Sequence, residues 1–236
     1  MKKKIKDYVK RIVYGERVSS ERYLEYLRKV GVKVGDNIKI IDPINFGIDL
    51  TRPFLIKLGN DITFSDHVTI LTHDYSWSVI ANKYPGEIYP SLGPVSIGNN
   101  VFVGSHATIL QNVKIGNNVV IGFGSVVTKD IPDNSVVAGV PAKIIATIDD
   151  LRDKLVNKHQ ENLSLLVKEY INTFGSKPDD YILREHITFY KTLDAIKEQN
   201  PTFYNYHKLY KVDRSINKYH DKDELISNIL EHNVKL

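Results

Sequence analysis

The segment ILTHDYSWSV, residues 70–79, gathers side chains that could carry out acid–base chemistry. It holds His73, Asp74 and Trp77, the only tryptophan of the 236-residue chain. Histidine suits proton removal at neutral pH because its unperturbed pKa lies near 6.5. Asp74 can orient the imidazole or cap a loop backbone, and Trp77 can cover a bound ligand or simply anchor the segment. His73 is therefore a candidate for acid–base chemistry, with a turn histidine as the alternative interpretation.

These residues interrupt a six-residue repeat. Its first positions are apolar in six of seven hexads before the interruption, Arg52 being the exception, and in all six hexads after it. They are Val34, Ile40, Phe46, Arg52, Leu58, Phe64 and Ile70, then Ile97, Val103, Ile109, Ile115, Ile121 and Val127.

The six-residue period fits neither the 3.6 residues of a helical turn nor the alternation of a strand. It fits short strands joined by tight turns into stacked coils, with polar third and fourth positions outside. The first residue of each hexad would point into a narrow prism, and the compact fifth residue would lie near the corner. Glycine, frequent at the second position, would relieve backbone strain at the turn.

The repeat resembles that of the hexapeptide-repeat acyltransferases. The segment GSVVTKDIPDNSVVAGVPAKII, residues 124–145, is similar to the end of the β-helix in bacterial maltose, galactoside and polysaccharide O-acetyltransferases. The resemblance implies a left-handed parallel β-helix over residues 31–146, with a loop at 74–94, in a subunit of a homotrimer. Residues 1–30 are then an N-terminal helical segment and residues 147–236 a C-terminal helical extension.

The resemblance also implies a reaction. It is acetyl-CoA-dependent transfer of an acetyl group to a sugar hydroxyl, with surface-polysaccharide biosynthesis as the expected context. His73 takes the family's general-base place at the base of the loop, and the backbone amide of Ser105 would stabilise the oxyanion. Because the chain has no cysteine and no G-x-S-x-G segment, we expect direct transfer without a covalent acyl-enzyme.

Further site residues follow from the same resemblance. The donor site would consist of Gly104, Ser105, Phe123, Thr128, Lys129 and Lys143. The acceptor site would include Asn45, Asp49, Tyr75 and Trp77. For the two lysines, a solvated surface position is the alternative interpretation. The chain has Phe102 where galactoside and maltose enzymes have tryptophan, and Phe123 where they have a small residue, so the acceptor is less well defined than the reaction.

Three other functions stay open. The first is an acetyltransferase of an antibiotic or another small hydroxylated molecule. The second is a zinc enzyme resembling the γ-class carbonic anhydrases, because His67, His73 and His106 all occupy outward fourth positions and His106 would stack above His67. That family's pair of ligands five residues apart is missing from the coil, so we expect no metal. The third is a scaffold without catalytic activity.

Composition excludes several classes of protein. The hydrophobic fraction of 42% supports a folded core, and the net charge of +4 favours small anionic ligands but is too low and dispersed for nucleic acid. The lack of cysteine excludes disulfides and Cys-ligated zinc. With no secretory apolar region and no run of about 20 apolar residues, we expect a soluble cytoplasmic protein.

Helix signals mark both ends of the chain. Apolar residues from Ile5 to Val13 suit a basic amphipathic helix that packs on the protein itself or, alternatively, on a membrane surface. Further helices are predicted with a Ser20 cap and an end at Gly31, from Asp149 or Asp150, from Pro178 to before Pro201, and after a capping box at residues 221–224. The C-terminal extension could cap the β-helix or help to bind a large acceptor.

Overall fold

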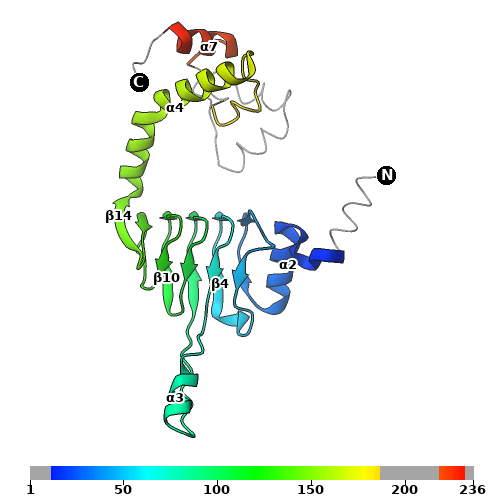
Figure 1. Cartoon of the computed structure of the whole chain (residues 1–236), viewed down its shortest axis with the longest axis vertical. Coiled ribbons are helices and arrows are strands. Elements are labelled where there is room, and N and C mark those ends of the chain that lie inside the picture. The colour runs from blue at the N-terminus through cyan, green and yellow to red at the C-terminus, as the bar shows by residue number, and fades with distance from the viewer. Residues whose placement is uncertain (1–11, 187–217, 232–236) are drawn as a thin grey trace. The chain divides into compact units, whose positions relative to one another are not determined.

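The computed structural model describes residues 12–186 and 218–231 (Figure 1). The chain divides into two compact units between Arg152 and Asp153. The first unit contains the repeat and the helices before it, and the elements described in the second unit are helices. Residues 5–11 of the predicted N-terminal helix lie outside the described residues, while Ile12 and Val13 are exposed.

The first unit is a three-sided parallel β-helix, because successive strands take their places on three faces in turn. The first face consists of β1 (Lys33–Val34), β4 (Ile56–Leu58), β7 (Val95–Ile97) and β10 (Val113–Ile115). The second face consists of β2 (Lys39–Ile40), β5 (Ile62–Phe64), β8 (Val101–Val103), β11 (Val119–Ile121), β13 (Ser135–Ala138) and the antiparallel β14 (Lys143–Thr147). The third face consists of β3 (Gly47–Ile48), β6 (Thr69–Ile70), β9 (Thr108–Ile109) and β12 (Val126–Val127).

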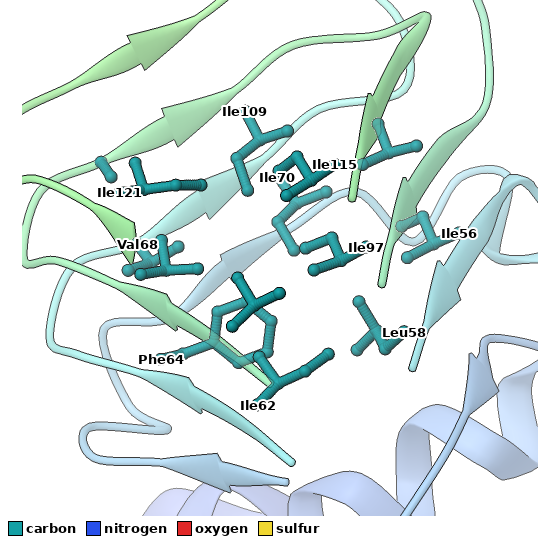
Figure 2. Packing of buried hydrophobic residues seen from close by; sticks show 14 of the residues in the cluster. Ile56, Leu58, Ile62, Phe64, Val68, Ile70, Ile97, Ile109, Ile115 and Ile121 are labelled. Atoms are coloured by element: carbon teal, nitrogen blue, oxygen red, sulfur yellow. The ribbon is translucent and has the colours of Figure 1, made fainter. Parts of the chain in front are cut away.

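The predicted hexad pattern builds the core. Phe64 pairs with Val103 and Ile70 with Ile109, so inward residues stack on their counterparts in the next coil (Figure 2). The first-position residues Ile40, Phe46, Leu58, Phe64, Ile70, Ile97, Val103, Ile109, Ile115, Ile121 and Val127 are all buried. Fifth-position residues are buried too, including Ile56, Ile62, Val68, Val101, Ala107, Val113 and Val119. Apolar residues of both positions therefore fill the prism.

The first coil departs from the predicted period. Leu58 pairs with Val34, 24 residues earlier, whereas Ile115 pairs with Ile97, 18 residues earlier. The six extra residues of the first coil include the short 3-10 helix η2 (Pro53–Leu55). Arg52 immediately precedes this helix and is not an inward core position, which explains the one charged residue among the predicted first positions.

The predicted role of the second-position glycines is wrong. It is the fourth position that has positive φ, between 54° and 61°, at Asn37, Asp61, His67, Asn100, His106, Asn112 and Asn118, and Asn134, beyond the last hexad, has a φ of 59°. Glycine at the second position is required by close stacking of successive turns. A Cβ at Gly59 would lie 2.4 Å from the carbonyl oxygen of Gly98, and one at Gly98 would lie 2.5 Å from that of Gly116.

Short helices close one end of the coil. Helix η1 (Gly15–Val18) leads into α2 (Ser20–Val30), which buries Tyr23, Leu24 and Leu27 in the same core. Ser19, not the predicted Ser20, caps α2 by accepting from the amide of Arg22, and the Ser20 hydroxyl accepts from the amide of Ile40. Gly31 ends the helix with a φ of 109°, as predicted.

The second unit has a core of its own. Helix α4 (Ile148–Phe174) begins where the aspartates predicted it, and α7 is Lys222–Glu231. Among the described residues, its buried hydrophobic cluster consists of Leu163, Val167, Leu183, Leu225, Ile226 and Ile229.

Two helix signals in the second unit have different outcomes. Asp221 accepts from the amide of Glu224, as the predicted capping box requires. The Glu224 carboxylate, however, accepts from the amide of His220 and not from that of Asp221, one residue later. Residues 178–186 do not form the predicted helix, since 180–186 are turns, and the rest of that prediction lies outside the described residues. No helix of the described segments is both long and apolar enough to cross a bilayer.

Candidate active site

A loop leaves the coil after β6 and returns at β7. Its base is a narrow neck, in which His73 pairs with Leu92 in an isolated antiparallel bridge and Gly93 donates to the Thr72 carbonyl at 2.9 Å. Beyond the neck, helix α3 (Trp77–Lys83) projects away from the stacked coils (Figure 1). The neck fixes the backbone of His73 where the coil opens.

Asp49 lies directly behind His73. The Oδ2 atom of Asp49 is in very short contact with the imidazole Nδ1, and the side chains are 4% and 15% exposed, respectively. Because a carboxylate only accepts, this contact assigns the hydrogen to Nδ1 and leaves the lone pair on Nε2. The imidazole is therefore held in the tautomer that can take a proton at Nε2.

Asp49 is itself held by the coils around it. Its carboxylate accepts from the Thr51 amide at 2.9 Å, the Thr51 hydroxyl at 2.7 Å and the Thr72 hydroxyl. Burial alone would raise the pKa of Asp49, but hydrogen bonds from Thr72, Thr51 and His73 outweigh it and hold that pKa well below its usual value. The side chain predicted to contact the acceptor is thus a buried anion behind the histidine.

Asp74 has the second of its two predicted roles. Its Oδ1 atom accepts from the Ser76 amide and hydroxyl, and its Oδ2 atom accepts from Gln111 at 2.9 Å. Hydrogen bonds from Ser76 and then Gln111 lower the pKa of Asp74 to about 2. Asp74 therefore caps the start of the loop, and the imidazole of His73 is oriented by Asp49.

A pocket of about 330 Å³ opens beside His73. The Tyr75 ring lies edge-on to the imidazole at a centroid distance of 5.1 Å, and Trp77 lies 6.2 Å from Tyr75. The lining consists of Thr51, Arg52, His73, Asp74, Tyr75, Trp77, Ile88, Pro90 and Ser91. Sequence reasoning missed Thr51 and Arg52, although the charge of Arg52 at an apolar repeat position was a signal.

Ser105 lies at a different corner of the prism. It follows β8 on the second face, whereas His73 follows β6 on the third face, so the third face separates the two residues within one chain. The Ser105 hydroxyl contacts Asp66 and lies 2.7 Å from the Ser65 hydroxyl. Among the described residues, the Ser105 amide donates to no acceptor, so it is available to a ligand.

The other predicted donor residues surround Ser105 or follow it. Gly104 stacks closely on the next coil, where a Cβ would lie 2.8 Å from the Phe123 amide nitrogen. Phe123 is 74% exposed, and Thr128, Lys129 and Lys143 are exposed as well. Asn45, predicted for the acceptor site, instead donates to Asp42 in an exposed turn and is not part of the pocket lining.

His67 and His106 stack on each other as predicted, with centroids 4.6 Å apart and an interplanar angle of 17°. One ligand atom each of Asp66, His67 and His106 lies within 4.8 Å of the others. A nitrogen lone pair lies in the plane of its ring, and two stacked, nearly parallel planes do not meet at one ion, so a shared cation would require one side chain to rotate. His106 also meets the Phe123 ring at 5.5 Å.

Known proteins resemble this chain over its repeat. The family model of the bacterial transferase hexapeptide (six repeats) matches residues 94–129. Protein CapG of Staphylococcus aureus is 44% identical over 132 residues, which cover 55% of this chain and 74% of CapG. The galactoside O-acetyltransferase of Escherichia coli K12 is 42% identical over 110 residues, about half of either protein. The crystal structure of a maltose O-acetyltransferase from Clostridium difficile 630 is 28% identical, with a TM-score of 0.38 over 54% of this chain and 75% of the other.

The chain belongs to the hexapeptide-repeat acyltransferases, and its three-faced coil is the predicted left-handed parallel β-helix. The family match at residues 94–129 lies within the coil and does not extend to the helical second unit.

Proposed function

We propose that the protein transfers an acetyl group from acetyl-CoA to a sugar hydroxyl, with His73 as the general base. The observation that supports this function best is the imidazole of His73, which is oriented by a buried carboxylate and opens on a pocket with two aromatic side chains. Aromatic faces suit the apolar faces of a sugar ring. The named relatives include acetyltransferases of galactosides and maltose, in agreement with a sugar acceptor.

In the proposed reaction, Nε2 of His73 takes the proton of the acceptor hydroxyl as the hydroxyl oxygen attacks the thioester carbonyl carbon. The Asp49 carboxylate stabilises the imidazolium that forms, because it contacts the opposite nitrogen. The carbon–sulfur bond then breaks, and the imidazolium returns its proton to the departing thiolate. Every transferred proton therefore passes through one nitrogen of His73.

The negative oxygen of the tetrahedral intermediate needs a donor, and the amide of Ser105 is the proposed one. Since His73 and Ser105 lie at different corners of one prism, a complete site requires Ser105 from a second copy of the chain. A homotrimer, with three equivalent contacts of this kind, is the proposed assembly. The donor groove would contain Gly104 and Phe123.

Exposed groups at the end of the coil would hold the rest of the donor. Lys129 and Lys143 can pair with phosphate groups of the coenzyme, and Thr128 can donate to its pantetheine arm. Because acetyl-CoA is supplied in the cytoplasm, we infer that the reaction occurs there. Surface-polysaccharide biosynthesis is the proposed context for the acetylated sugar.

The test is thiol release from acetyl-CoA with a panel of sugars. His73→Ala should lower kcat at least about a hundredfold without a change in coenzyme affinity, because the base acts only on the acceptor. Near-normal transfer by this variant would contradict the mechanism.

Mixed assemblies test the shared site. Co-expression of His73→Ala with Phe123→Glu should restore activity. Where the two variants meet, the Phe123→Glu copy can supply an intact His73 and the His73→Ala copy an intact donor groove. Each variant alone should stay inactive. An inactive mixture, in assemblies shown by mass to contain both variants, would contradict a site shared between copies.

A further inference from the structure

Arg52 reaches the pocket because of the six extra residues in the first coil. On one side, Thr51 is fixed by two hydrogen bonds to Asp49, at 2.9 and 2.7 Å. On the other side, η2 begins at Pro53, and the Leu55 amide donates to the Arg52 carbonyl at 3.0 Å. The backbone of Arg52 is therefore held next to His73, and the half-buried side chain lines the same pocket.

The guanidinium of Arg52 has little to bind within the described part of the protein. Its recorded polar contact is a long one, 3.5 Å from Nη1 to the Thr51 hydroxyl, and no carboxylate lies within ion-pair distance. Arg17 and Arg28 differ, since they donate to backbone carbonyls at 2.7 and 2.6 Å, respectively. Those two arginines hold the fold together, whereas the donors of Arg52 remain available to a ligand.

The two carboxylates near the pocket do not pair with the guanidinium of Arg52. The Asp49 carboxylate accepts from Thr51, Thr72 and His73 and is almost fully buried. The oxygens of Asp74 accept from Ser76 and Gln111. Both carboxylates are thus occupied by neighbouring donors, whereas Arg52, which lines the pocket, has no ionic partner among the described residues.

We propose that Arg52 selects an acidic acceptor, a sugar that carries a carboxylate or another anionic oxygen group. A guanidinium presents parallel N–H donors that match two oxygens of such a group, which an ammonium cannot do. Tyr75 and Trp77 would contact the sugar ring while Arg52 holds its anionic substituent and His73 the reacting hydroxyl. This inference rests on the proposed sugar acceptor and adds its chemical class.

The experiment compares acceptors that differ only at one carbon. Galactose, galacturonate and galactose 6-phosphate form one set, and glucose and mannose provide further sets. Binding to the full-length protein is measured by ligand-observed NMR titration, and transfer by thiol release. The protein should bind at least one acidic sugar about 10- to 100-fold more tightly than its neutral counterpart, as expected for hydrogen bonds to a charged group.

Variants assign this preference to one side chain. Arg52→Gln should bring the acidic and neutral dissociation constants within about threefold of each other, and Arg52→Lys should keep part of the preference. Lys57→Gln, which removes the same charge from the exposed position of strand β4, should keep all of this preference. A general loss of structure would weaken acidic and neutral sugars alike and leave their ratio unchanged.

The outcomes separate the two proposals. Equal binding of acidic and neutral sugars in every set, or an acid preference that survives in Arg52→Gln, overturns the role of Arg52. Arg52-dependent acid binding without acetyl transfer supports that role and counts against the proposed reaction. The carboxylate and phosphate members of each set show which anionic group is preferred.

Discussion

The Asp49→Asn substitution tests how much of the proposed catalysis comes from the carboxylate behind His73. Asparagine has nearly the same shape, so the pocket should keep its lining. The carboxylate now accepts from His73 and from two threonines. The amide has one acceptor oxygen and turns an NH₂ group toward some of these donors, and it carries no charge to stabilise an imidazolium.

The expected loss follows from these contacts. A hydrogen bond between charged groups contributes about 1.5–3 kcal/mol, which corresponds to roughly a 10- to 150-fold change in rate. The bond to His73 gains its ionic character when the imidazole takes the proton, so kcat and kcat/KM should fall together. Asp49 is almost fully buried, so some loss of folding stability should accompany the change.

The assay is steady-state thiol release from acetyl-CoA, with thermal unfolding measured on the same samples. Asp133→Asn is a matched control, because Asp133 also accepts from backbone and side-chain donors but lies at another corner, beside Asn117. It should leave kcat unchanged. If Asp49→Asn stays folded and keeps kcat within about threefold of the original protein, the pairing of Asp49 with His73 has no catalytic role.

Three further outcomes concern the stability of the coil. Gly98→Ala should cost about 1–3 kcal/mol of unfolding free energy, because the new Cβ would meet the neighbouring turn; an unchanged urea midpoint would contradict this account of the glycines. Ile109→Ala should cost about 2–5 kcal/mol because Ile109 is fully buried, whereas Ile145→Ala, at an exposed site, should stay within about 0.5 kcal/mol; equal midpoints would disprove the assigned core. Because the folded pKa of Asp49 is lowered, its stabilising contribution is present above the unfolded pKa near 3.9 and is lost as the pH falls further; urea unfolding between about pH 6 and pH 2 should show a decline that is shallower in Asp49→Asn.

Regular parts of the coil could be predicted closely from the sequence. Each inward residue, such as Ile97 or Ile109, stacks on a counterpart one coil away, so the requirement repeats at every hexad. A repeated local requirement leaves a periodic signal in the chain. The same six-residue period predicted that His67 and His106 stack on each other, and this prediction is confirmed.

The irregular first coil could not be predicted in this way. The first coil has six extra residues, one whole hexad, so the six-residue period appears unbroken in the sequence. In the structure, however, Ile48 pairs with Ile70, although the period predicts Phe46, two residues earlier, at that place. Phe46 is still buried and lies against Phe64, which preserved the apolar pattern. The glycine spacing was likewise visible, but its cause, contact with the next turn, depends on stacking between coils.

The sequence by itself determined the coil, the loop and the place of His73 at its base, because neighbouring hexads specify these features locally. Only the tertiary structure decided what surrounds that histidine. Asp49 and Arg52 come from a coil of irregular length, and stacking of that coil beneath the loop brings Asp49 behind His73 and Arg52 to the pocket lining. No local pattern encodes such a contact, because it depends on how many residues the chain uses to return to the same corner of the prism.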